Sequence, residues 1–372
     1  MKTSIERAAL LKSLNHVQSV VERRNTIPIL SNVLIEGQGR ELKLSATDLD
    51  IEIIESLPAD VIAAGGTTVS AHLLYDIVRK LPDGAQVQLN LSDNGGQLAL
   101  KAGRSNFRLS ALPREDFPAL ASGDLPHSFA LPPDDLKRII DKTRFAISTE
   151  ETRYYLNGIY LHAAETNGKG VLRAVSTDGH RLARFELPLP PGAQKMPGII
   201  VPRKAVLELR KLLDDASEPV EIALSDNKIR FAFDEVVLTS KLIDGTFPDY
   251  ARVIPTGNDK VLRVDAKRFK ESVDRVSTIA TEKSRAVKLT LADNRLTLAV
   301  INPDSGSASE ELDADYAADA LEIGFNARYL MEITDQVDGA EVEFVLADAG
   351  SPTLVRDPED ARALYVIMPM RV

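Results

Sequence analysis

The sequence predicts an α+β protein made of three similar domains, each with two helices and antiparallel strands. Three long segments repeat one order of elements at a spacing of about 125 residues: a helix, a short acidic or glycine-containing turn, and a strand. They read VSAHLLYDIVRKLPDGAQVQLNLSDN from Val69, VPRKAVLELRKLLDDASEPVEIALSDN from Val201 and GFNARYLMEITDQVDGAEVEFVLADA from Gly324. The short turns favour antiparallel organisation over a doubly wound parallel sheet. A chain of 372 residues also exceeds a single core, which stops growing at roughly 250–300 residues.

Smaller landmarks keep the same spacing and indicate the domain boundaries. The recurring pairs are Thr47-Asp48 with Thr177-Asp178, and Phe117-Pro118 with Phe247-Pro248. Proline-bearing connectors, PREDFPALASGDLP and FPDYARVIPTGNDK, follow the first two copies. We therefore expect domains at 1–121, 122–252 and 253–372.

Each domain is expected to hold two helices. Residues 5–22 place Leu10, Leu14, Val17 and Val21 on one face, as in an amphipathic helix. The strands that follow the later helices carry apolar residues at every second position, which is typical of strands with one buried face. Six similar half-domains, each one helix and a few strands, are the simplest interpretation.

Positive charge is concentrated in the helices. The six segments 4–24, 71–81, 132–144, 202–213, 265–275 and 326–337 hold 19 of the 45 Lys and Arg residues but only 12 of the 55 Asp and Glu residues. The chain as a whole carries a net charge of −10. One interpretation is that helix propensity alone enriches Lys and Arg there. The other is that the helices share one mildly basic face that meets a polyanion such as DNA.

Composition and motifs exclude several kinds of site. There is no cysteine, so disulfides, thiolate-metal sites and cysteine nucleophiles are excluded. No apolar run approaches the ~20 residues of a membrane helix, and the charged N-terminal residues do not resemble a signal peptide, so we expect a cytoplasmic protein. Phosphate-loop, G-x-G-x-x-G and H-E-x-x-H motifs are absent. The five histidines, His16, His72, His127, His162 and His180, never take metal-ligand spacing, so no cofactor or metal is expected.

The stretch STDGHRL, residues 176–182, raises the alternative of a hydrolase using Ser176, Asp178 and His180. A nucleophilic triad normally draws its members from separate segments, whereas these share one short piece of chain. Thr177-Asp178-Gly179 instead has the composition of a turn. The first domain repeats the Thr-Asp pair without a histidine, as expected if the pair is structural.

Several stretches together resemble the sliding clamps, the beta subunits of bacterial DNA polymerase III. They are RYYLNG from Arg153, TDGHRLA from Thr177, IVPRK from Ile200, SKLIDGTFPDY from Ser240, GFNARY from Gly324 and YVIMPMRV from Tyr365. The resemblance runs essentially end to end. It implies three clamp domains per chain and a head-to-tail homodimeric ring, with helices lining the hole and sheets outside.

The resemblance also implies a surface pocket that binds a peptide from each client protein. Its residues would be Tyr155, Leu156, Thr177, Gly179, His180, Arg181, Leu182, Pro248, Arg252, Val253, Tyr329, Val366, Ile367, Met368, Pro369, Met370 and Arg371. Apolar side chains would form the floor, and methionine adapts to varied ligands. The alternative for the apolar tail residues is core packing in a last strand.

Further positions follow from the same resemblance. Phe107 and Leu109 would meet Ile279 of a second copy, where Thr278 replaces a larger aliphatic residue of the family. Arg23, Arg24 and Asn25 would face DNA, unless the arginines are only a solvated helix end. Glu150, in the matching loop of the second domain, would weaken contact with phosphate.

The implied function is a non-catalytic processivity factor that encircles duplex DNA without sequence specificity. Its implied partners are the replicative polymerase, an ATP-driven clamp loader, and translesion polymerases and repair proteins with a glutamine-led leucine and phenylalanine motif. A monomeric protein-binding scaffold is the remaining alternative.

Overall fold

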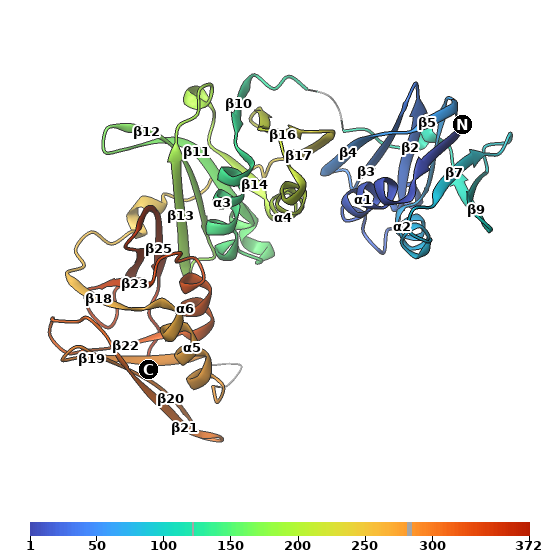
Figure 1. The fold of residues 1–372 in the computed structure, drawn as a ribbon. Helices are drawn as coiled ribbons and strands as arrows, with labels where there is room; N and C mark the ends of the chain where they lie inside the picture. The colour runs from blue at the N-terminus through green and yellow to red at the C-terminus, as the bar shows by residue number, and fades with distance from the viewer. Residues whose placement is uncertain (121–122, 281–284) are drawn as a thin grey trace. The chain divides into compact units, whose positions relative to one another are not determined.

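The computed structural model describes residues 1–120, 123–280 and 285–372. In them one order of elements, β-α-β-β-β, occurs six times, once for each expected half-domain (Figure 1). The first half-domain contains β1 (Lys2–Glu6), α1 (Arg7–Val17), β2 (Asn32–Gln38), β3 (Glu41–Thr47) and β4 (Ile51–Pro58). The second contains β6 (Gly65–Ser70), α2 (Ala71–Lys80), β7 (Gln86–Leu91), β8 (Gln97–Ala102) and β9 (Ser105–Leu112). A short strand, β5 (Asp60–Ala63), connects the two.

The other four half-domains repeat the order. The third contains β10 (His127–Leu131), α3 (Pro133–Thr143), β11 (Gly158–Thr166), β12 (Lys169–Thr177) and β13 (Arg181–Pro188). The fourth contains β14 (Ile199–Pro202), α4 (Arg203–Leu212), β15 (Val220–Leu224), β16 (Lys228–Phe233) and β17 (Val236–Lys241). The fifth contains β18 (Lys260–Asp265), α5 (Ala266–Ser277), β19 (Ala286–Ala292), β20 (Arg295–Asn302) and β21 (Gly306–Asp313). The sixth contains β22 (Leu321–Asn326), α6 (Ala327–Thr334), β23 (Glu341–Leu346), β24 (Thr353–Asp357) and β25 (Asp360–Ile367).

The helix predicted at 5–22 is shorter than expected. Ile5 belongs to β1, and α1 ends at Val17. Beyond the helix, the Lys204 ammonium donates to the carbonyl of Val20 at 3.0 Å, and His72 Nε2 lies 2.9 Å from the carbonyl of Val21. Side chains from elsewhere thus satisfy the backbone here, so the apolar period continues to Val21 without a helix.

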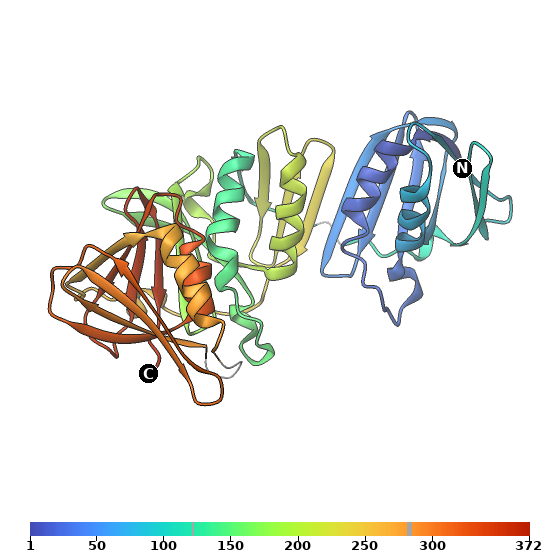
Figure 2. The ribbon, with the colours of Figure 1, turned by 60° about the horizontal axis from the view of Figure 1, so that its bottom comes forward.

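The chain forms two compact units. The first comprises Met1–Leu136, Pro190–Pro197 and Lys204–Leu242, and the second comprises Lys137–Leu189, Gly198–Arg203 and Ile243–Val372. The first contains a 13-stranded sheet, and the second contains an 8-stranded and a 4-stranded sheet. Helices α1 and α2 lie side by side in the first unit, as α5 and α6 do in the second (Figure 2). All strand pairs among the described residues are antiparallel, which confirms the α+β prediction.

Half-domains are joined in pairs because each gives its first strand to the other. Strand β1 pairs with β7 and β6 with β2; β10 pairs with β15 and β14 with β11; β18 pairs with β23 and β22 with β19. Each exchange extends both sheets of a pair. The half-domains of a pair therefore cannot separate without breaking two strand ladders.

Last strands join one pair of half-domains to the next. Strand β4 of the first half-domain pairs with β17 of the fourth, with Ile51 opposite Ser240. Strand β13 of the third pairs with β25 of the sixth, with Arg181 opposite Ile367. We call these two strand pairs the seams of the chain.

An ionic cluster centred on the buried pair His16 and Glu55 closes the β4–β17 seam. His16 at the end of α1 places Nδ1 2.9 Å from Glu55 Oε2 and Nε2 3.2 Å from Asp215 Oδ2, and Lys12 Nζ lies 3.4 Å from the same Asp215 oxygen. Burial lowers the pKa of His16, but the hydrogen bonds and charges of Glu55 and Asp215 outweigh it and raise the pKa overall.

We expect the first compact unit to lose stability as the pH rises through the raised pKa of His16. A group with a higher pKa in the folded state stabilises fully below its unfolded value, near 6.5, and this contribution disappears above the folded pKa. Urea unfolding of the wild type at a series of pH values from 6 to 9 measures it. The His16→Gln variant is the control, and its free energy of unfolding should not change with pH across that range. Equal pH dependence of the unfolding free energy in both proteins would contradict the prediction.

Candidate functional site

The turn Thr177–Arg181 is a network of side-chain-to-backbone hydrogen bonds. Thr177 Oγ1 donates to the carbonyl of Arg181 at 2.7 Å and accepts from Gly179 N at 3.1 Å. Asp178 Oδ1 accepts from His180 N at 2.9 Å and from Arg181 N at 3.0 Å. Gly179 sits at φ 87°, in the left-handed region. Thr177 and Asp178 therefore build the turn, and the exposed positions are those of Gly179 and His180.

The first domain builds the same turn with the same bonds. Thr47 Oγ1 donates to the carbonyl of Ile51 at 2.8 Å and accepts from Leu49 N at 3.0 Å. Asp48 Oδ1 accepts from the amides of Asp50 and Ile51, both at 2.9 Å. Leu49 takes the left-handed conformation at φ 80°, where the second turn has glycine. The predicted structural role of the Thr-Asp pair agrees with these bonds.

We expect opposite stability effects from exchanging glycine and side chain in these two turns. Leu49→Gly should stabilise by roughly 0.5–1 kcal/mol, because it relieves left-handed strain at a residue that is 41% exposed. Gly179→Ala should destabilise by about 1–2 kcal/mol, because its Cβ would lie 2.5 Å from Arg153 Nη1 at a positive φ. Denaturant unfolding of each variant measures both. Changes of the same sign would contradict the prediction.

The three residues of the hydrolase alternative do not form a triad. Ser176 is fully buried, and its Oγ donates to the carbonyl of Thr143 at 2.5 Å. Both oxygens of Asp178 are occupied by the turn and by Arg181 Nε. His180 is exposed and stacks on Tyr329 with ring centroids 6.3 Å apart. The base therefore reaches neither the nucleophile nor the acid, and the alternative is wrong.

An apolar cluster lies beneath this turn. Its buried members come from five separate segments: Leu156, Val175, Leu182, Ile200, Phe247, Tyr250 and Val366. Tyr155, Tyr160, Ile243, Ile254, Leu354 and Leu364 pack on it while half-buried. The structure thus brings together four predicted site residues, namely Tyr155, Leu156, Leu182 and Val366, that are distant in sequence.

Exposed apolar side chains stand beside the cluster. Val253 is 50% exposed and Met368 is 39% exposed. Pro248 and Arg252 are also exposed, on and next to the short turn Tyr250–Val253 that anchors Tyr250 in the cluster. Exposed apolar groups next to a buried apolar cluster are suited to bind an apolar ligand.

The C-terminal tail divides into a core part and a surface part. Val366 and Ile367 end β25 and are buried, at 2% and 0% exposure. After them Met368 N donates to the carbonyl of His180 at 2.9 Å, and Met370 N donates to the carbonyl of Gly324 at 2.8 Å. Pro369 and Met370 are half-buried, whereas Arg371 is exposed. Core packing, the alternative for these positions, therefore describes Val366 and Ile367.

A polar rim joins the turn to α6. The Arg181 guanidinium lies 4.3 Å from the Tyr329 ring centroid and bonds to Glu332 and to the carbonyl of Phe145. Burial raises the pKa of Tyr329, with Asp178 adding to the effect. Arg181 is itself only 6% exposed, so it orients Tyr329 and the turn more than it faces solvent.

Sequence reasoning missed Arg153 as a member of this surface. Its Nε donates to Glu150 Oε2 at 2.8 Å, and its Nη2 donates to the carbonyl of Asp178 at 3.2 Å. The hydrogen bond from Arg153 lowers the pKa of Glu150. The motif RYYLNG contained the signal, since Arg153 begins it. Glu150, expected to face DNA, is thus ion-paired beside the turn; its place near DNA stays a prediction.

The other predicted positions lie at surfaces. Arg23 and Arg24 are exposed and Asn25 half-exposed in the loop after α1. Phe107 is half-buried and Leu109 buried on β9. Thr278 is exposed at the end of α5, where its Oγ1 donates to the carbonyl of Asp274 at 3.2 Å, and Ile279 is half-buried next to it.

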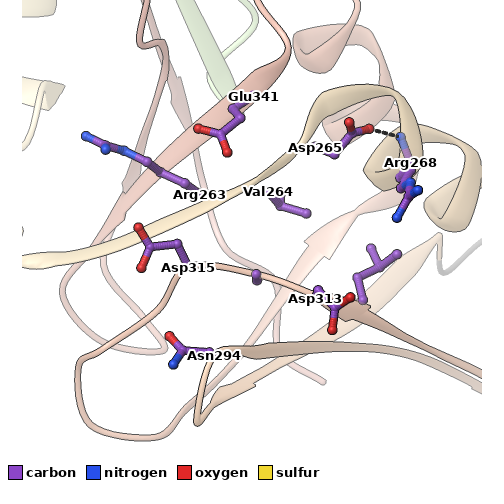
Figure 3. Close-up of a pocket in the computed structure, with 10 residues that line it drawn as sticks. Arg263, Val264, Asp265, Arg268, Asn294, Asp313, Asp315 and Glu341 are labelled. Atoms are coloured by element: carbon purple, nitrogen blue, oxygen red, sulfur yellow. Dashed lines mark hydrogen bonds between the residues drawn. The ribbon is translucent and has the colours of Figure 1, made fainter.

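A separate cleft of about 510 Å³ lies between β18, the start of α5 and the end of β21 (Figure 3). Four carboxylates line it, Asp265, Asp313, Asp315 and Glu341, together with two arginines. Asp265 caps α5 by accepting from Arg268 N at 2.8 Å, and Arg263 pairs with Glu343. This polar, acidic cleft is suited to neither an apolar peptide nor DNA.

Within residues 1–120, 123–280 and 285–372, no three His, Asp or Glu side chains are placed to share a metal ion. No helix of that part of the chain is long and apolar enough to span a membrane.

Comparison with known proteins gives matches along the whole chain. Models of the N-terminal, central and C-terminal domains of the DNA polymerase III beta subunit match residues 1–121, 130–249 and 251–371. The beta sliding clamps of Caulobacter vibrioides (strain NA1000) and Escherichia coli (strain K12) are 55% and 38% identical, each over 100% of both chains.

Solved structures agree with these matches. A sliding clamp from Bartonella birtlesii bound to griselimycin has a TM-score of 0.97 and 51% identity, with 100% of both chains covered. A Caulobacter crescentus beta sliding clamp with bound polyethylene glycol has a TM-score of 0.98 and 55% identity, covering 100% of this chain and 99% of that one. The expected three-domain fold is confirmed.

Proposed function

Because the chain belongs to the beta subunit family of DNA polymerase III, the non-catalytic sliding clamps, we propose that two copies close head-to-tail around duplex DNA and tether the replicative polymerase to it. Three clamp domains at 1–121, 122–252 and 253–372 form each half of the ring. Helices line the hole and sheets form the outside. The protein works in the cytoplasm, on the nucleoid.

The pairing of last strands carries this proposal. Last strands pair at both seams of the chain, β4 with β17 and β13 with β25. Two last strands remain, β9 of the second half-domain and β21 of the fifth. Strand β21 ends its sheet, and in the described residues β9 pairs beyond β8 only at Ala111 and Leu112. Open strand edges invite pairing, and the same rule applied between copies joins β9 of one to β21 of the other.

The register of this third pairing follows from the other two. Ile51 of β4 and Arg181 of β13 are each the first residue after a Thr-Asp turn, and Gly306 begins β21 at the same place. Ser240, the partner of Ile51, corresponds to Leu109 on β9, counted from the hairpin pairs Ala232–Val237 and Lys101–Asn106. We therefore expect Leu109 opposite Gly306 and Phe107 opposite Ala308. Since β9 belongs to the first domain and β21 to the third, a head-to-tail pair of copies has two such seams, and we propose that these close the ring.

We expect Thr278→Leu to tighten the dimer. Phe107, Leu109 and Ile279 would surround this position at the new seam, and burying a large apolar side chain contributes about 1.5–3 kcal/mol, or roughly 10-fold or more in the dimer dissociation constant. Sedimentation velocity across a dilution series measures the constant. Thr278→Ser is the matched control and should not tighten the dimer; an unchanged constant for Thr278→Leu would place the seam elsewhere.

The surface around Thr177–Leu182 is proposed to bind client peptides. Leu156, Leu182, Val366 and Ile367 support it from below, while Tyr155, Pro248, Val253, Tyr329, Met368 and Met370 contact the peptide. Thr177, Gly179, His180, Arg181, Arg252, Pro369 and Arg371 complete its rim. Two or three apolar anchors, less the cost of ordering a flexible peptide, predict affinities near micromolar, or about −8 kcal/mol.

The clients proposed for this surface are the polymerase, translesion polymerases and repair proteins with a glutamine-led leucine and phenylalanine motif. An ATP-driven loader opens the ring, since no nucleotide motif occurs in the chain. Arg23, Arg24 and Asn25 contact DNA phosphates, and the ion pair of Glu150 with Arg153 moderates the acidic charge at the matching loop.

Solution mass is the first test of this proposal. A dimer of the 372-residue chain at micromolar concentration is expected, and a monomer at all concentrations would leave the scaffold alternative. The encirclement of DNA is tested separately below.

A further inference from the structure

One helix position carries a cation in all three domains. His16 on α1, Lys142 on α3 and Arg275 on α5 each follow a buried apolar residue of the helix core by two positions: Leu14, Ile140 and Val273. Helices α1 and α3 precede hairpins whose last strands, β4 and β13, form the seams of the chain, and α5 precedes the hairpin that ends in β21, the strand proposed to pair with a second copy. The three cations therefore occupy equivalent places beside β4, β13 and β21.

At both seams of the chain, this cation binds a carboxylate that follows a helix of the other half-domain. His16 Nε2 lies 3.2 Å from Asp215, which follows α4. Lys142 Nζ lies 2.9 Å from Asp338, which follows α6. At the first seam the cation also binds the last strand, through Glu55 of β4 at 2.9 Å. The complete network thus has three members: strand carboxylate, helix cation and the carboxylate after the opposite helix.

Arg275 has the first two members of this network within its own chain. Glu310 of β21 is the fifth residue of its strand, as Glu55 is of β4. Arg275 Nε donates to Glu310 Oε2 at 3.0 Å, and Nη2 donates to Glu310 Oε1 at 2.6 Å. The third member must come from the half-domain whose last strand joins β21. On the proposed function, that half-domain is the second one of another copy.

Asp83 is the residue of the second half-domain at the required place. It lies two positions after the buried Leu81 that follows α2, as Asp215 lies two positions after the buried Leu213 that follows α4. Its side chain is 96% exposed. Arg7 Nη1 donates to Asp83 Oδ1 at 2.6 Å, and a carboxylate has a second oxygen to offer.

We propose that Arg275 of one copy binds Asp83 of a second copy and completes at the ring seam the three-membered network already formed at the first seam of the chain. Guanidinium Nη1 is the donor to the second copy, since Nε and Nη2 bind Glu310. The inference rests on the proposed head-to-tail dimer. Because the contact joins two opposite charges at the protein surface, we expect it to weaken as the salt concentration rises.

A double-mutant cycle on the full-length protein tests the contact. Sedimentation velocity gives the dimer dissociation constant of the wild type, Asp83→Asn, Arg275→Gln and the double variant at low and moderate salt. We expect each single change to raise the constant about 10-fold, as is typical for a close charge pair. The double variant should be no weaker than the weaker single variant. Asp226→Asn, an exposed carboxylate on a distant hairpin, is the matched control and should change nothing.

The outcomes separate this inference from the function on which it rests. A dimeric wild type whose two single effects multiply in the double variant would overturn the Arg275–Asp83 contact alone. A wild type that stays monomeric would overturn the proposed ring, and this contact with it. Loss of the salt dependence in Asp83→Asn, with unchanged circular dichroism, supports the contact and shows that the variant folds.

Discussion

Once loaded onto a closed circular duplex, the protein is expected to remain bound until the circle is cut, and then to leave within seconds. Retention on the circle should exceed retention on a linear duplex of the same length by roughly two orders of magnitude or more, because non-specific electrostatic contact alone gives dissociation constants of only about 10⁻⁴–10⁻⁶ M. The chain has a net charge of −10, so its grip on DNA through charge is weak. Only topology then prevents escape.

Gel filtration of labelled protein loaded by a cognate clamp loader measures this retention, before and after a restriction enzyme opens the circle. Linear DNA with both ends blocked by bound protein is the control, and it should hold the clamp as the circle does. Equal loss from circular and linear DNA would refute encirclement, even if the protein proves to be a dimer.

Removal of Met368–Val372 is expected to abolish stimulation of the polymerase while leaving the dimer intact. The deletion begins after Ile367, so β25 and its pairing with β13 remain. It removes Met368 and Met370 from beside the apolar cluster. Loss of two apolar anchors, at about 1.5–3 kcal/mol each, weakens a micromolar complex by more than roughly 100-fold.

Primer extension on a singly primed circle, with limiting polymerase, measures the loss. The double variant Met368→Ala with Met370→Ala keeps the backbone bonds to His180 and Gly324, so it should reproduce the loss without the truncation. Val372→Ala is the matched control, because Val372 packs against Gly324 and is 63% exposed, and it should retain stimulation. Full stimulation by the double variant would show that the tail is not the client site.

The sequence predicted the helices and the six half-domains well because both rest on periodicity. The apolar faces of 71–81, 202–213 and 265–275 correspond closely to α2, α4 and α5. The prediction that residues 18–22 are helical was wrong. The side chains of Lys204 and His72 bond to backbone carbonyls there, and because both residues are distant in sequence, the local sequence does not indicate these bonds. The sequence also did not predict that half-domains exchange their first strands, because the same alternating pattern of a strand fits pairing within its own half-domain or with the other one.

The site was predicted in a different way. The structural role of the Thr-Asp pair was predicted from its turn composition, and the pair makes the same hydrogen bonds in both domains. Membership of the surface came from resemblance, which supplied Met368 and Tyr329 but not Arg153 or Phe247. Whether a tail residue is buried depends on the pairing of β25 with β13, so alternation alone could not separate Ile367 from Met368.

The shared geometry of the two Thr-Asp turns bears on how such a protein diversifies after duplication. The four hydrogen bonds in each copy stabilise the turn, so selection on stability favours keeping the Thr-Asp pair whatever the exposed positions carry. The exposed positions of the turn can then change without loss of the loop. The second turn has Gly179 and His180 where the first has Leu49 and Asp50, and such positions are free to evolve contacts with a ligand. On the proposed function, one such loop per chain gives a dimer two client-binding sites instead of four, so client proteins must bind in turn.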